Sequence, residues 1–104
     1  MEVKAFDEKV EKFIDSLERQ TRSKVERHID LLEKFGNQLR MPYSKSLGSN
    51  LFELRIKGQH EVRVFYTFDN NKAVFLHGFI KKSQKTPQKE LEIAKSKLKL
   101  LTNT

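Results

Sequence analysis

Basic and aromatic side chains alternate with apolar ones in three consecutive segments of the chain, which read LFELR, VRVFY and FLHGFIKK. Successive side chains of a strand point to opposite faces, so one set should face a core and the other solvent. The set predicted to face outward comprises Arg55, Arg63, His77 and Lys81, with Phe65, Phe75 and Phe79 between them. Cations bind backbone phosphates, and aromatic rings stack on bases. The pattern therefore predicts a surface that contacts RNA.

The same residues could support cleavage of RNA without a metal ion. That reaction needs a base for the 2′-hydroxyl, a cation for the charged phosphorane and an acid for the leaving 5′-oxygen. His77 is the natural proton-transfer group near neutral pH, and Arg63 suits bidentate contact with a phosphate. Lys81 and Lys82 could bind phosphates, or one of them could act as the base if neighbouring cations favour its neutral form.

Each of these residues also has a purely structural interpretation. His77 could be a strand histidine that is hydrogen-bonded within the fold, and Arg63 could form an ion pair with Glu53 or Glu61. The two lysines could lie at a solvated strand end. The three histidines are dispersed and the chain has no cysteine, so no metal site and no cofactor are expected.

The apolar faces of the three segments constrain the loops between them. In all three, apolar residues fall at even positions: Phe52, Leu54 and Ile56; Val62, Val64 and Phe68; Val74, Leu76 and Ile80. Antiparallel partners share a face, so the first hairpin needs an odd loop, most simply Gly58–His60, or a compensating bulge. The turn over Asp69–Lys72 likewise needs an odd loop or a compensating bulge.

This register has a consequence for the charges. It places Arg55 opposite Arg63 and places Phe65 or Arg63 near His77. Like charges that face each other across strands are unfavourable by roughly a few tenths of a kcal/mol. An anion is therefore expected between the two arginines, and a phosphate would serve.

Two helices that form a hairpin are predicted before the strands. Asp7 is a suitable N-cap for the first helix, and the second starts near Thr21 and ends at Gly36, where glycine allows a left-handed conformation. The segment Met1–Phe6 is ambiguous between a short first strand and an extension of the first helix.

The rest of the chain completes an α+β domain. Residues 37–50 are interpreted as a loop, and the strands span about 51–57, 61–69 and 73–81. A third helix begins at Thr86–Pro87, where a capping residue precedes proline. The fold prediction is a helical hairpin packed on a small antiparallel sheet of three strands, alternatively four with one from the N-terminus, and a C-terminal helix.

Composition limits the class of protein. The 104 residues fit a single domain over 1–104, and the formal net charge of +7 favours an anionic partner. There is no membrane-length apolar run and no signal-peptide core. We expect a cytoplasmic protein with no membrane association.

Four short sequence motifs of this chain resemble those of the RelE/ParE toxin superfamily, and in particular of its HigB-like, phage-associated branch of type II toxin–antitoxin systems. They are Lys45-Ser46-Leu47, the run from Leu51 to Arg55, the run from Arg63 to Tyr66, and the run from Leu76 to Pro87. The resemblance covers roughly Phe6 to Leu101. It implies a compact RelE-like toxin that cuts mRNA in the ribosomal A site, contacts ribosomal RNA, and is neutralised by a helix-turn-helix antitoxin.

The resemblance also assigns roles to residues. Arg63 matches the sheet arginine of the family, and Lys81 and Lys82 match the basic end of its last strand, so that with His77 they are the predicted catalytic group. The predicted RNA contacts are Lys45, Arg55, Lys57, Phe65, Phe79 and Lys85. Two features depart from the pattern: no tyrosine follows Tyr66, and the best-known ribosome-dependent nucleases of the fold have no counterpart of His77.

Two other functions remain open at this point. The first is a ParE-like inhibitor of DNA gyrase on the same fold, because a fold does not fix a function. The second is an inactive module whose basic face only holds an acidic antitoxin segment. Phe65 and Phe79 bear on the choice: they could stack on bases, but burial under the C-terminal helix is favoured.

Overall fold

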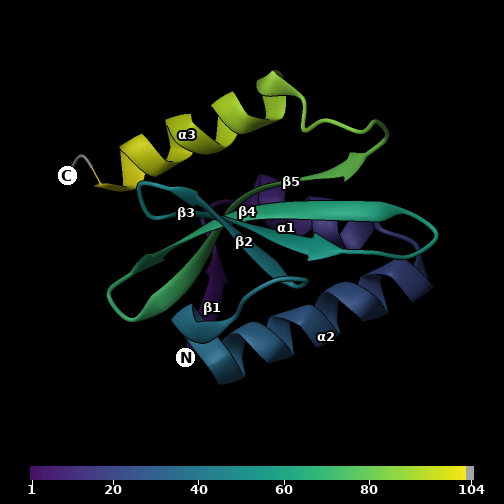
Figure 1. The fold of residues 1–104 in the computed structure, drawn as a ribbon, viewed down its shortest axis with the longest axis horizontal. Coiled ribbons are helices and arrows are strands. Elements are labelled where there is room, and N and C mark those ends of the chain that lie inside the picture. The colour runs from purple at the N-terminus through teal and green to yellow at the C-terminus, as the bar shows by residue number, and fades with distance from the viewer. Residues whose placement is uncertain (103–104) are drawn as a thin grey trace.

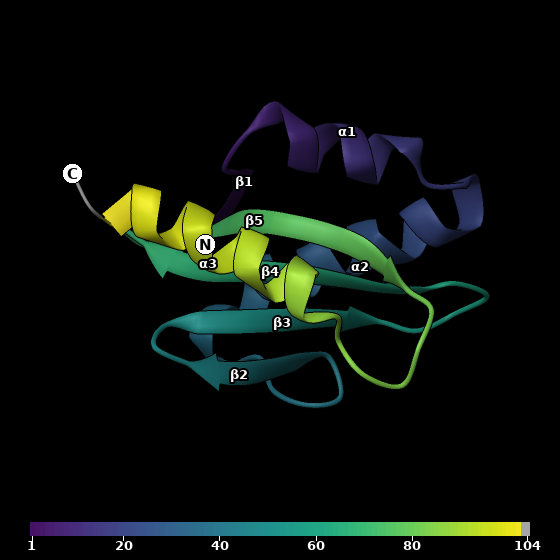
Figure 2. The ribbon, with the colours of Figure 1, turned by 90° about the horizontal axis from the view of Figure 1, so that it is seen from above.

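The structure, a computed structural model, describes residues 1–102 as three helices and one mixed sheet. The elements follow in the order β1 (Glu2–Ala5), α1 (Glu8–Ser16), α2 (Arg19–Phe35), the short 3₁₀ helix η1 (Gly36–Gln38), β2 (Ser44–Gly48), β3 (Leu51–Ile56), β4 (Glu61–Asp69), β5 (Lys72–Lys81) and α3 (Gln88–Thr102). The strand order is β1-β5-β4-β3-β2, with β1 parallel to β5 and the other neighbours antiparallel. Helices α1 and α2 lie on one face and α3 on the other (Figure 1, Figure 2). Among residues 1–102, no helix has the length and apolar character needed to span a membrane.

The α+β class and the C-terminal helix are confirmed, and so is the alternative of a further strand from the N-terminus, but the predicted helical hairpin on three antiparallel strands does not match the five-stranded mixed sheet exactly. The ambiguous N-terminal segment forms β1, which pairs with β5 in parallel. The segment interpreted as a loop contains β2, which pairs with β3. Strand β2 reads SKSLG and buries only Ser44, so it has no alternation of apolar residues that the sequence could reveal. Edge strands such as this one are held by backbone pairing more than by a buried face.

The register shows how the two hairpins keep their faces. Ile56 pairs with Val62, so an odd number of residues lies between these two partners, as predicted. The β4–β5 turn instead has two central residues, Asn70 and Asn71, both with positive φ (49° and 62°). A bulge between Phe65 and Tyr66 compensates for this even turn, which is the alternative that the sequence left open.

Between the turn and the bulge the faces of β5 are reversed, so the even-position prediction was wrong for Val74 and Leu76, whereas Ile80, opposite Val62, keeps the predicted face. Val74 and Leu76 pack with α3, whereas Ala73 and Phe75 pack with α1 and α2. Phe75 is therefore a core residue and not part of the predicted outward surface. That surface is itself partly covered, because the sheet carries an apolar cluster on each face.

The helix termini follow from local chemistry. Asp7 caps α1 and accepts a hydrogen bond from the Val10 N–H at 3.2 Å, and its carboxylate lies 3.0 Å from Lys97 Nζ of α3. Burial alone would raise the pKa of Asp7. The hydrogen bonds from Lys97 and Val10 and the charges of Lys97 and Lys9 outweigh it, so the pKa lies below the ordinary 3.8. Helix α2 ends at Gly36, whose φ of 55° supports the predicted stop.

Two contacts fix the sheet against its neighbours. Tyr66, which is 1% exposed, places its hydroxyl 2.5 Å from Ser44 Oγ and so links β4 to β2. Burial raises the pKa of Tyr66, although the hydrogen bond with Ser44 and the charge of Arg40 oppose that rise. On β5, a Cβ added to Gly78 would lie 2.6 Å from Cδ2 of Phe13, so glycine lets α1 approach the sheet closely.

Candidate nucleic-acid interface

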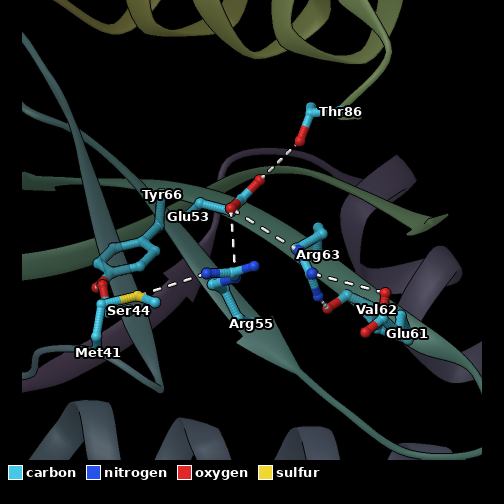
Figure 3. A network of polar contacts seen from close by, with 9 residues as sticks. All are labelled: Met41, Ser44, Glu53, Arg55, Glu61, Val62, Arg63, Tyr66 and Thr86. Atoms are coloured by element: carbon cyan, nitrogen blue, oxygen red, sulfur yellow. Dashed lines mark hydrogen bonds and ion pairs between the residues drawn. The ribbon is translucent and has the colours of Figure 1, made fainter. Parts of the chain in front are cut away.

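Two arginines share one carboxylate on the face of the sheet that α3 covers in part (Figure 3). Arg55 of β3 and Arg63 of β4 are cross-strand partners, as predicted. Glu53 Oε1 lies 3.8 Å from the Nε atom of each. Thr86, which precedes α3, donates a hydrogen bond to Glu53 Oε2 at 3.2 Å. The carboxylate thus joins two strands and the loop that leads into α3.

The anion expected between the arginines is thus the protein's own carboxylate. A phosphate is not needed to separate the two charges, so the pairing of Arg55 with Arg63 alone is no argument for a phosphate site. The structural interpretation of Arg63 as the partner of Glu53 and Glu61 accounts for its position, because its Nη2 atom is also 3.7 Å from Glu61 Oε2.

The charges in this cluster are nevertheless poorly satisfied. Within residues 1–102, the buried Nε atoms of Arg55 and Arg63 have no hydrogen-bond partner, because 3.8 Å is too long for one. The Arg63 side chain is 1% exposed, whereas Glu61 is 42% exposed. Burial and the charge of Arg55 lower the pKa of Arg63, and the charges of Glu53 and Glu61 oppose this. Here the buried Arg63 and the partly buried Arg55 share one buried carboxylate, and the second carboxylate is half open to solvent.

A pocket of about 400 Å³ adjoins the cluster at the end of β5. Its lining is Glu61, Lys81, Lys82, Ser83 and Gln84. Glu61 pairs with Lys81 across the strands and also faces Arg63. An anion in this pocket would meet the two lysines directly. It could reach the buried Arg63 only by displacing the Glu61 carboxylate.

His77 occupies a separate place under α3. Its Nε2 atom lies 3.0 Å from Glu90 Oε1, and its ring stacks on Phe79 with the planes 18° apart. It lines a different pocket of about 290 Å³, together with residues of α1 and α3 such as Phe13 and Lys97. Four residues along a strand span about 13 Å. The structure therefore does not bring His77 together with Lys81 at one point.

Residues 12–99, which make up most of the chain, match the model of the family described as phage derived protein Gp49-like (DUF891). The chain belongs to this Gp49-like family. The family falls among the RelE/HigB-like toxins and is associated with toxin–antitoxin systems, which implies an antitoxin partner. No curated protein matches the chain closely enough to count as a relative.

The remaining predicted contacts of this Gp49-like protein are divided between surface and interior. Phe65 and Phe79 stack on each other at 5.7 Å under α3, so the burial favoured from the sequence is confirmed. In this arrangement they cannot stack on bases. Lys45, Lys57 and Lys85 are exposed. Lys45 pairs with Glu53 in the β2–β3 register, and Lys57 starts the turn between β3 and β4.

Three side chains of the interface were not singled out from the sequence as site residues. Glu53 was considered only as a partner of Arg63, and neither Thr86 nor Glu90 was linked to the strands. A signal for Glu53 existed, because it shares a face with Arg55 and lies diagonal to Arg63 in the predicted register. The contacts of Thr86 and Glu90 depend on how α3 packs, which local patterns in the sequence do not reveal.

Proposed function

We propose that this protein is the toxin of a type II toxin–antitoxin system and acts as a ribosome-dependent endoribonuclease on mRNA. The observation that carries the proposal is the pocket of Lys81 and Lys82 above the poorly satisfied cluster of Arg55 and Arg63. A phosphodiester in this pocket would receive two ammonium groups at once and a guanidinium on displacement of Glu61. Preorganised cations at the position where phosphorane charge develops are a main source of catalysis.

The chemistry divides among these groups as follows. Attack of the 2′-oxygen on phosphorus breaks the bond to the 5′-oxygen and leaves a 2′,3′-cyclic phosphate and a 5′-hydroxyl. Arg63 would stabilise the charged phosphorane, and an ammonium of Lys81 or Lys82 would give its proton to the 5′-oxygen. His77 could take the 2′-proton only if it left Glu90 and the RNA spanned the roughly 13 Å along the strand to the lysine pocket, so the second lysine of the pair is the nearer candidate for the base.

The other predicted residues would have separate roles in binding RNA and in supporting the sheet. Lys45, Arg55, Lys57 and Lys85 would contact RNA next to the pocket, whereas Phe65 and Phe79 would support the sheet beneath it. The antitoxin implied by the family would be a helix-turn-helix protein, and its binding would block access to this surface. The site of action would be the cytoplasm.

The test is a cell-free translation reaction with purified protein, followed by primer extension on the mRNA. Breaks that appear only when ribosomes are loaded would support the proposal. The variant Lys81→Gln/Lys82→Gln should lower the rate of cleavage by roughly 100-fold or more. The matched variant Lys4→Gln/Lys34→Gln removes two exposed lysines elsewhere and should retain activity.

Other results would count against particular parts of the proposal. An intact message would remove the nuclease function, and gyrase-dependent DNA breaks would favour the ParE-like alternative. Ribosome-dependent cleavage that survives in Lys81→Gln/Lys82→Gln would show that the site is elsewhere. Full cleavage by His77→Ala would assign His77 a purely structural role with Glu90.

A further inference from the structure

The exposed side of α2 carries a group of hydrogen-bond donors that the candidate interface does not use. Together these side chains line a hollow of about 520 Å³: Arg19, Gln20, Ser23, Lys24 and Arg27. Each of the five can donate a hydrogen bond, three are cationic and none is a carboxylate. Within residues 1–102, the ion pairs of the structure involve none of these three cations.

This hollow is linked to the candidate interface through the β3–β4 turn. Lys24 Nζ lies 3.5 Å from the carbonyl oxygen of Lys57, which begins the turn. The turn leads directly to Glu61 in the pocket of Lys81 and Lys82. Both ribbon views place the start of α2, this turn and the end of β5 at the same end of the molecule (Figure 1, Figure 2).

We propose that Arg19, Lys24 and Arg27 form a second contact surface for the phosphate backbone of RNA, continuous around the β3–β4 turn with the candidate interface. The eight helical steps from Arg19 to Arg27 extend about 12 Å along the helix axis, enough for more than one phosphate. Arginine and lysine side chains free of carboxylates are the groups that release counterions when RNA binds. The choice of RNA as the partner rests on the proposed function.

Binding can be measured without cleavage, so the two proposals can fail separately. The variant Arg19→Gln/Arg27→Gln removes two cations from α2, and Lys4→Gln/Lys34→Gln is the matched control. Fluorescence anisotropy would follow the affinity for a labelled 16-base-pair RNA duplex and for one of its single strands between 50 and 200 mM KCl. The two probes distinguish folded ribosomal RNA from an extended message as the source of the backbone.

Loss of two phosphate contacts reduces the slope of log affinity against log salt by about 1.8 for a duplex and about 1.4 for a single strand, if the RNA value follows that of DNA. Over this fourfold change in salt, the wild-type protein should lose about 12-fold more duplex affinity than Arg19→Gln/Arg27→Gln, since four to the power 1.8 is about 12. The slope of the control should match that of the wild type. Thermal unfolding should show little change, because exposed substitutions cost within about 0.5 kcal/mol.

Three outcomes would overturn the inference. If Arg19→Gln/Arg27→Gln kept the wild-type slope of log affinity against log salt, α2 would make no phosphate contact. If Lys4→Gln/Lys34→Gln lowered the slope equally, the change would reflect net charge alone. If Arg19→Gln/Arg27→Gln bound poly-glutamate more weakly than the wild-type protein but kept the same salt dependence for RNA, the partner would be an acidic protein. If the double variant does not fold, Arg27→Gln alone should show half the change in slope. A reduced slope in a protein that cuts no message would leave this surface standing and remove only the nuclease function.

Discussion

Substitution of Glu53 by glutamine tests the central cluster most directly. Glutamine retains the size of the side chain and can still accept the hydrogen bond from Thr86, but it removes the negative charge that Arg55 and Arg63 share. Arg63 would then retain only Glu61, and Arg55 would lose the one carboxylate with which it forms an ion pair among the described residues. We expect a large loss of stability from this single change.

The expected magnitude follows from the burial and the distances. Removing one partner of a buried ion pair typically costs about 3–5 kcal/mol, because a charge is left uncompensated. The value here should be near the lower limit, since both contacts are 3.8 Å long and Glu61 still faces Arg63. A loss of about 3 kcal/mol in a domain of this size lowers the Tm by roughly 12–24 °C.

The assay is thermal and urea unfolding of Glu53→Gln beside the control Glu2→Gln. Glu2 pairs with Lys72 at the same distance of 3.8 Å, but it is 62% exposed. The control should therefore cost less than about 1 kcal/mol. The double variant Glu53→Gln/Arg55→Met removes one of the two stranded charges and should recover part of the loss. Equal stabilities of Glu53→Gln and Glu2→Gln would refute the view that the cluster depends on a shared buried carboxylate.

Three further predictions concern the scaffold. Asp7→Asn should be less stable than the wild-type protein at pH 7. Folding lowers the pKa of Asp7 from 3.8, so the difference in stability should persist above pH 3.8 and vanish as the pH falls through the lower pKa of the folded state. Urea unfolding between pH 7 and 2 would show this. Tyr66→Phe should lower the free energy of unfolding by about 1 kcal/mol near neutral pH, because a hydrogen bond is lost. Burial raises the pKa of Tyr66 above 10.0, so the wild-type protein should lose stability above that pH. The variant should lose less, as unfolding curves at alkaline pH would show. Gly78→Ala should cost about 1–3 kcal/mol by forcing Phe13 aside, and a second variant with Phe13→Ala should cost less than the sum of the two single changes.

The parts of the fold that local patterns determine were predictable from the sequence. The strands of the two hairpins, the cap at Asp7 and the stop at Gly36 all lie close to their predicted positions. The pairing of Arg55 with Arg63 followed from parity together with the simplest odd loop, Gly58–His60. Each of these features depends on residues that are near one another in the sequence, or on the requirement that strand partners share a face.

The parts that were missed depend on contacts between distant segments. Strand β2 joins the sheet through backbone pairing and carries little apolar alternation, whereas β1, which the sequence left open as a first strand, alternates Val3 and Ala5 over only four residues. The bulge on β5 is forced by the two-residue turn at Asn70 and Asn71, and it moved Phe75 from the expected surface to the core. For the site, charge and spacing identified the right strands, but only the packing of α3 shows which cations remain accessible.

The two carboxylates of the cluster are suited to different tasks, and this reconciles its stability with the proposed chemistry. Glu53 is 5% exposed and held by Thr86, so it remains with the arginines whether or not an anion is bound. Glu61 is half exposed and forms part of the wall of the lysine pocket. A phosphate that displaced Glu61 would replace one anion by another beside Arg63, so the cost of burying the guanidinium is already met by the fold. Arg63 can therefore be dry and preorganised before an anion arrives, which is the condition under which a fixed charge would stabilise the proposed transition state most strongly.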